Sequence, residues 1–277
     1  MQKRIEIPLG AESFDPNSHV TEEIRWDAPN LRFIKKVTSA TLTLHLPARE
    51  DSAPAVLICP GGVYGGVSID KEGHHFADWL SARGVAGAVL KYRMPCPPSP
   101  HLPFPVVDFF QALEALADYD GIDPRRVVFA GFSAGGHLAG LCAVRFAELA
   151  RKAGFAGPPP AGVALLYPVV SMREGFSHGG SRANLIGSDA GPAETDFYSM
   201  ETGVGAASPP LFLVHAEDDK GVPIANSELL ASRYREAGKP MEFLTYPEGG
   251  HGFGMAVGRK PLGDWVPAFG AWLDSLS

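Results

Sequence analysis

Residues 127–138 read VVFAGFSAGGHL, which is a short apolar run, then the pattern Gly-x-Ser-x-Gly, then the start of an alanine-rich segment. The run VVFA has the composition of a buried strand, and the alanine-rich segment that of a helix. A serine between a strand and a helix, flanked by small residues, is typical of a nucleophile elbow, a sharp turn that projects the hydroxyl above a sheet. Side chains at 131 and 135 would collide with neighbouring elements. Ser133 is therefore the candidate nucleophile, and the alternative is a glycine-rich turn that only packs closely.

Similar apolar runs recur along the chain and alternate with helical patterns. Strands are expected at Arg32–Thr38 and Thr41–Leu46 and then at 55–59, 85–92, 127–131, 162–167, 211–215 and 241–246. Helices are expected at 74–84, 105–119, 133–154, 225–238 and 263–276. This alternation predicts an α/β fold, a three-layer sandwich with a mostly parallel central sheet of about eight strands.

The length of 277 residues suits one large domain, and we expect a single domain over residues 1–277. Residues 1–30 are polar and irregular, which predicts an N-terminal arm. Residues 171–208 are rich in glycine, serine and proline, and we expect them to form an excursion beside the functional site. The proline-dense stretch 94–105 is expected to be a stiff loop near its mouth.

Charge and composition exclude several partners. The net charge is −7 and basic residues never run beyond pairs, so a nucleic-acid partner is not expected. No apolar run reaches the roughly 20 residues that cross a bilayer, so no membrane partner is expected. The first residues lack the apolar core of a secretory signal, which predicts a cytoplasmic location. Among the three cysteines, Cys59 and Cys142 lie in apolar surroundings and are expected to be buried free thiols, and Cys96 lies in the proline-dense stretch.

A serine nucleophile requires a base, and the base requires a group that orients it. The segment HAEDDKGVP, 215–223, follows one expected strand, and GGHGFG, 249–254, follows another. We therefore expect His251 as the base and Asp219 as its acid, with Asp218 as the alternative acid that would otherwise point outward or cap the next helix. The competing interpretation of 215–223 is a solvated acidic loop. His137, one turn after Ser133 on the same helix, is expected to support the site.

The glycine-rich stretch ICPGGVYGG, 58–66, follows the strand expected at 55–59. It lacks the Lys-Ser/Thr of a phosphate-binding loop and the spacing of a dinucleotide fingerprint. Beside a serine nucleophile, an oxyanion hole is the better interpretation, with backbone donors at Gly62, Val63 and Ala134. The alternative is a flexible turn with no role.

No metal site is expected. His74 and His75 adjoin Glu72, but the spacing of these residues does not match a set of zinc ligands.

Several blocks together carry a resemblance to a known family: PGGVYGG (60–66), LKYR (90–93), GFSAGGHL (131–138), LLYPVVSM (165–172), HAEDDKGVP (215–223) and EGGHGFG (248–254). Over about residues 35–277 the chain resembles the acetyl esterase/lipase branch of the bacterial α/β-hydrolase superfamily, which includes acetylxylan-esterase- and xylanase-like carboxylesterases. The branch usually has glycine at position 63. Valine disfavours positive φ, so a locally reshaped loop is expected there.

The resemblance implies an α/β-hydrolase fold and a serine carboxylesterase. Its substrates would be small-molecule esters with short acyl groups such as acetyl, in some cases on carbohydrates, cleaved through a Ser-His-Asp triad and an acyl-enzyme. It implies no metal or organic cofactor, and it suggests that Tyr64 and Tyr92 lie near the substrate pocket.

Two rival functions stay open at this point. The same triad could act on an amide, as in an arylformamidase or a peptidase. The fold could also be kept by a non-catalytic binding protein. A homo-oligomer is possible.

Overall fold

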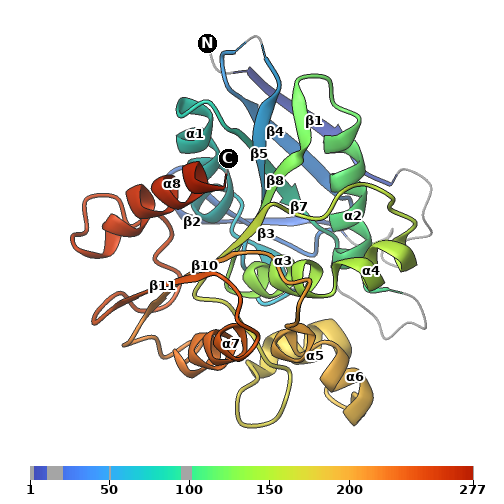
Figure 1. Cartoon of the computed structure of the whole chain (residues 1–277), viewed down its shortest axis with the longest axis vertical. Helices are drawn as coiled ribbons and strands as arrows, with labels where there is room; N and C mark the ends of the chain where they lie inside the picture. The colour runs from blue at the N-terminus through green and yellow to red at the C-terminus, as the bar shows by residue number, and fades with distance from the viewer. Residues whose placement is uncertain (1–2, 11–20, 50, 95–101, 277) are drawn as a thin grey trace.

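Figure 1 shows the computed structural model, which describes residues 3–10, 21–49, 51–94 and 102–276. Its centre is an eight-stranded sheet in the order β1-β4-β7-β5-β8-β9-β10-β11. The strands are β1 (Lys3–Pro8), β4 (Thr41–Leu46), β5 (Ala53–Cys59), β7 (Ala86–Lys91), β8 (Ile122–Phe132), β9 (Gly162–Leu166), β10 (Leu211–Ala216) and β11 (Met241–Tyr246). All neighbours from β7 to β11 are parallel, and β4 pairs antiparallel with both β1 and β7. The predicted sheet is confirmed.

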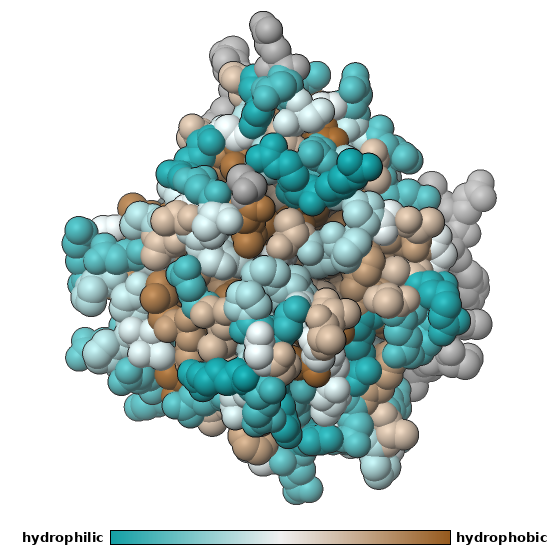
Figure 2. Space-filling model, viewed as in Figure 1, coloured by the Kyte–Doolittle hydropathy of each residue, from teal (hydrophilic) through white to brown (hydrophobic). Residues whose placement is uncertain are grey.

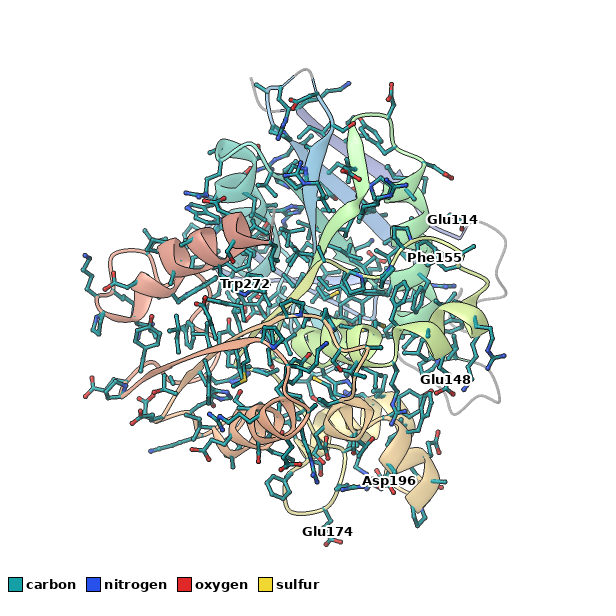
Figure 3. The ribbon with its side chains drawn as sticks, viewed as in Figure 1. Glu114, Glu148, Phe155, Glu174, Asp196 and Trp272 are labelled. Carbon is teal, nitrogen blue, oxygen red and sulfur yellow. The ribbon has the colours of Figure 1, made fainter. Side chains whose placement is uncertain are left out.

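Helices cover both faces of this sheet (Figure 1). One layer holds α1 (His75–Ala82) and α8 (Trp265–Ser275), which meet where the ring of Phe76 lies 5.6 Å from Trp265 and 5.3 Å from Phe269. The other layer holds α2 (Phe104–Ala117), α3 (Ala134–Val144), α4 (Phe146–Ala153) and α7 (Ala225–Glu236). In Figure 3, Phe155 lies beside α2 and α4, and its ring contacts Phe110 and Phe146.

The central strands are buried on both faces. Every residue of β9 and β10 is buried, as are the last five of β5. This is why these strands appear in the sequence as continuous apolar runs without alternation. The expected helix at 133–154 is divided, because Arg145 leaves helical geometry (φ −110°, ψ 25°) between α3 and α4.

The prediction of an irregular arm at 1–30 is wrong for its described residues. β1 forms an edge of the main sheet, and β2 (Glu23–Ala28) pairs with β3 (Leu31–Lys35), which pairs with β6 (Gly66–Val67) in a second sheet. An edge strand buries only one side, so in β1 half-buried Ile5 and Ile7 alternate with exposed polar residues. Such a short polar strand resembles a loop in sequence. Residues 11–20 of the expected arm lie outside the described residues.

The excursion at 171–208 is more regular than its sequence suggests. It contains α5 (Gly179–Ile186), α6 (Pro192–Phe197) and the 3-10 helix η2 (Met200–Gly203). These helices are too short for a clear 3.6-residue period, and α6 buries no residue. In Figure 3, Glu174 and Asp196 point away from the body of the protein at the outer end of this segment.

The two described cysteines are buried free thiols, as predicted, and burial raises the pKa of both Cys59 and Cys142. Cys96 and most of the proline-dense stretch lie outside the described residues. On the face in Figure 2, hydrophobic residues form small groups between hydrophilic ones. Over the described ranges, no helix has both the length and the apolarity to span a membrane.

A buried pair of histidines lies between the main sheet and α1. His45 Nε2 lies 2.9 Å from His74 Nδ1, and His45 Nδ1 lies 2.8 Å from an Asp78 carboxylate oxygen. Burial and the neighbouring His45 lower the pKa of His74 to about 4, since a buried imidazolium loses its hydration. Asp70 partly opposes this effect, and Arg32 and Arg4 add to it.

The histidine pair predicts acid sensitivity. A histidine with a pKa of 6.5 in the unfolded chain and about 4 in the native protein stabilises the native state above pH 6.5, and this contribution is lost as the pH falls to about 4. Such a pKa shift changes the free energy of unfolding by at most about 3 kcal/mol. Urea unfolding across this pH range should give a free energy of unfolding that declines less in His74→Asn than in the wild type. Parallel declines in both proteins would contradict this assignment.

Candidate active site

Ser133 occupies a strained turn between β8 and α3. Its backbone has φ 54° and ψ −121°, outside the usual regions for a residue with a side chain, and its N–H donates to the Leu166 carbonyl at 3.0 Å. A Cβ on Gly131 would lie 2.2 Å from the carbonyl oxygen of Gly135, and one on Gly135 would lie 2.1 Å from that of Cys59. The steric need for glycine at both positions is therefore confirmed.

His251 reaches Ser133 from the loop after β11. Its Nε2 lies 2.8 Å from Ser133 Oγ. The side chain of His251 is 29% exposed, whereas Ser133 is 7% exposed. The serine is thus more buried than the imidazole that contacts it.

Asp219 completes the hydrogen-bonded chain. Its Oδ2 accepts from His251 Nδ1 at 2.7 Å, and its Oδ1 accepts the N–H groups of Gly221 and Val222 at 2.8 and 2.9 Å. Burial opposes ionisation of Asp219, but hydrogen bonds from His215 and His251 and from the Val222 N–H outweigh it and hold its pKa below the usual range. The carboxylate is therefore ionised and fixed toward the imidazole.

His215, at the end of β10, contacts the same carboxylate. Its Nε2 lies 3.3 Å from Asp219 Oδ2 and 2.9 Å from the Val222 carbonyl, and its Nδ1 lies 2.7 Å from Ser227 Oγ. The only signal in the sequence was a polar residue at the end of an apolar strand, four residues before the acid.

Asp218 has a different position from its neighbour. It is exposed, as expected, but it does not cap the following helix. Its Oδ1 accepts the N–H groups of Gly249 and Gly250, each at 2.8 Å. Asp218 therefore supports the backbone of the loop that carries His251, and its hydrogen bonds go to that backbone, not to the imidazole.

The glycine-rich loop after β5 lies against the elbow. Gly62 has φ 151°, Val63 61° and Tyr64 54°, and a Cβ on Gly62 would lie 2.0 Å from the Gly66 carbonyl oxygen. Gly62 and Val63 are partly exposed, and no described residue accepts a hydrogen bond from either N–H. Ala134 begins α3, so its N–H also lacks an intrahelical acceptor.

The excursion touches this loop directly. Asn184 Nδ2 on α5 donates to the Val63 carbonyl at 2.8 Å, and a Cβ on Gly180 would lie 2.8 Å from Val63 Cγ1. Helix α5 therefore holds the peptide that follows Val63. No signal in the sequence indicated this role for Asn184.

Tyr64 and Tyr92 are held inside the protein. Both are fully buried, and their hydroxyls bond His137 Nδ1 at 2.8 Å and the Pro60 carbonyl at 2.7 Å respectively. Their contact with substrate stays a prediction. His137, whose Nε2 lies 2.7 Å from the Tyr198 carbonyl, links Tyr64 to the excursion.

Two further polar residues beneath the site were missed. Glu72 accepts the Gly61 N–H, and Tyr167 bonds both Glu72 and the Gly254 N–H. Tyr167 lies in the block LLYPVVSM that carries the family resemblance, but nothing in the sequence indicates that it meets Glu72. Among the residues that the structure describes, no three His, Cys, Asp or Glu side chains are grouped as metal ligands.

Comparison with known proteins gives the site a context. The chain is 32% identical over 244 residues to an acetylxylan esterase of Xylanibacter ruminicola, covering 86% of this chain and 48% of that protein. It is 32% identical to endo-1,4-beta-xylanase B of Butyrivibrio fibrisolvens over 73% of this chain and 32% of that protein. This chain therefore spans about half or less of the length of these relatives.

Among solved structures, an acetyl ester-xyloside bifunctional hydrolase from Caldicellulosiruptor lactoaceticus superposes with a TM-score of 0.80 at 28% identity, covering 98% of this chain and 96% of that one. A carboxylesterase from Lactobacillus plantarum, at 22% identity and a TM-score of 0.73, shares the fold over 92% of this chain and 96% of that one.

These findings confirm the α/β-hydrolase fold and the resemblance to acetyl esterases. Residues 105–276, well over half of the chain, match the prolyl oligopeptidase family. The chain belongs to the prolyl oligopeptidase family of α/β-hydrolases.

Proposed function

We propose that this protein is a serine carboxylesterase that hydrolyses short acyl esters, acetyl esters above all, on carbohydrates. The observation that carries the proposal is the hydrogen-bonded chain from Ser133 through His251 to Asp219, with unpaired N–H groups beside it. The residues are the nucleophile, the base and the orienting acid of an acyl-transfer site.

The geometry supports a two-step reaction. Ser133 Oγ attacks the ester carbonyl carbon while His251 Nε2 takes its proton, and Asp219 stabilises the resulting imidazolium. The N–H groups of Gly62, Val63 and Ala134 would bind the carbonyl oxygen as it becomes negative, each contributing about 3 kcal/mol. His251 then protonates the departing alcohol oxygen. In the second step His251 takes a proton from water, which attacks the acyl-enzyme and releases the acid.

The carbohydrate part of the proposal rests on the named activities of the relatives. The names of three similar proteins, an acetylxylan esterase, a xylanase and an acetyl ester-xyloside hydrolase, all refer to xylan or xylosides. The last of these resembles this protein over nearly the full chain at 28% identity.

An amide substrate is the second candidate, favoured by the match to the prolyl oligopeptidase family. The same triad can cleave an amide if His251 protonates the leaving nitrogen. In this chain the described residues before 105 supply β1, β4, β5 and β7 of the central sheet rather than a separate substrate-holding unit.

Replacing the nucleophile gives the first test. Ser133→Ala removes the attacking oxygen, so turnover of p-nitrophenyl acetate should fall at least about a thousandfold and covalent labelling by a fluorophosphonate should disappear. The protein should fold normally, because only one hydroxyl is lost. Undiminished turnover in the folded variant would refute the mechanism.

The adjacent aspartates provide a matched pair. Asp219→Asn should lower kcat by about three to four orders of magnitude, because an amide favours the wrong imidazole tautomer. Asp218→Asn keeps an oxygen that can accept the two loop N–H groups and loses only the charge, so it should lower kcat less than about tenfold. Equal losses in the two variants, measured with the same ester, would overturn the assignment of the acid.

Substrate choice is tested by a panel of compounds. We expect kcat/KM to be highest for p-nitrophenyl acetate and to fall as the acyl chain lengthens to lauroyl, and acetylated xylo-oligosaccharides should release acetate. N-formylkynurenine serves as the amide comparison. A higher kcat/KM for that amide than for every acetyl ester would favour the second candidate.

A further inference from the structure

One buried carboxylate beside the triad is not used by the proposed reaction. Glu72 lies in the helical turn η1 (Asp70–His74) and is 5% exposed. Its Oε2 accepts the Gly61 N–H at 2.8 Å, and its Oε1 accepts the Tyr167 hydroxyl proton, also at 2.8 Å. Both carboxylate oxygens are thus bonded to segments that border the active site.

Tyr167 extends this hydrogen-bond network to the loop that carries His251. Its hydroxyl oxygen accepts the Gly254 N–H at 2.9 Å, and its ring centroid lies 5.1 Å from that of His251 and 4.4 Å from that of Phe253. The backbone at Tyr167 has φ 39°, an unfavourable conformation for a tyrosine. Glu72 and Tyr167 therefore join the loop beside the nucleophile to the loop that carries the base.

Glu72 is the acceptor in both of its hydrogen bonds. The Tyr167 oxygen accepts from Gly254 and its proton is directed to Glu72, and the Gly61 N–H is the second donor. This is the pattern expected of an ionised carboxylate. Burial raises the pKa of Glu72, and the bonds from Tyr167 and Gly61 and the nearby His251 and Lys71 offset that rise only in part. A negative charge on Glu72 would lie near the imidazole of His251.

Gly61 shows why this contact matters for the reaction. A Cβ on Gly61 would lie 2.8 Å from Glu72 Oε2 and 2.9 Å from Ser133 Cβ, so the peptide is confined between the carboxylate and the nucleophile. Because the Gly61 N–H is turned inward to Glu72, it is not available to substrate. Its orientation determines where the following N–H groups, those of Gly62 and Val63, point.

We propose that Glu72, acting through Gly61 and Tyr167, is a positioning residue for the oxyanion hole and His251, and that its charge favours the imidazolium formed during the reaction. The inference rests on the proposed function, because it assigns Glu72 a role in the same acyl transfer. Glu72 does not touch the reacting atoms.

The test compares Glu72→Gln with the wild type on p-nitrophenyl acetate. Glutamine keeps the shape and one acceptor, but its amide cannot accept from both Gly61 and Tyr167. We expect kcat to fall about tenfold to a hundredfold with KM changed less than about threefold, because an interaction of the transition state is weakened. Loss of the charge should also disfavour the imidazolium, so the acid limb of kcat/KM should move to lower pH.

Two further variants separate positioning from stability. Tyr167→Phe breaks the link to Gly254 but keeps the carboxylate charge, so kcat should fall while the acid limb does not move to lower pH. Glu201→Gln changes another buried glutamate, 2% exposed, whose Oε1 accepts from Ser171 Oγ at 2.9 Å. This control should leave kcat per labelled site and the acid limb unchanged, whatever its effect on melting temperature.

Fluorophosphonate titration counts active sites in each protein and separates the possible failures. Wild-type protein that neither labels nor hydrolyses esters contradicts the proposed function, and the inference falls with it. An active wild type whose Glu72→Gln variant has the same kcat per site and the same acid limb contradicts the inference alone. If Glu72→Gln does not fold, an unchanged kcat in Tyr167→Phe contradicts it.

Discussion

The whole site depends on how closely three backbone segments approach one another without side chains between them. Gly135 at the start of α3 faces the carbonyls of Cys59 and Pro60, where a Cβ would lie 2.1 and 2.4 Å from the two oxygens. This contact brings the end of β5 against the turn after β8. The glycine-rich loop thereby lies beside Ser133. Any side chain at position 135 would move this loop relative to the serine.

Around that contact the charges are arranged asymmetrically. Asp219 bonds the imidazole directly, whereas Glu72 reaches the same region through Tyr167 and the backbone. Both acids are buried, and loop N–H groups donate to each of them. Asp219 also bonds His215 and His251, whereas Glu72 also bonds the Tyr167 hydroxyl. The two carboxylates and the loops that supply these N–H donors therefore hold each other in place.

The sequence predicts best what depends on local pattern. Buried parallel strands, the elbow at Ser133 and the glycines that flank it follow from apolar runs and steric limits, and the fold is confirmed. Positions that depend on long-range packing were not predictable. Tyr64 and Tyr92 lie beneath the glycine-rich loop, and Glu72 meets Tyr167 from 95 residues away. The edge strand β1 was mistaken for an arm, because one-sided burial leaves few apolar residues to detect.

Valine at position 63 shows how the excursion and the catalytic loop depend on each other. Val63 and Tyr64 both have positive φ, and such a conformation costs roughly 1–2 kcal/mol for each residue with a side chain. A single hydrogen bond contributes about 1 kcal/mol, so one contact does not offset that cost. Two contacts are present: Asn184 holds the Val63 carbonyl, and His137 holds the Tyr64 hydroxyl. Both lead to the excursion, Asn184 by lying on α5 and His137 through the Tyr198 carbonyl. The segment that borders the site therefore also maintains the strained loop, through Asn184 and the Tyr198 carbonyl.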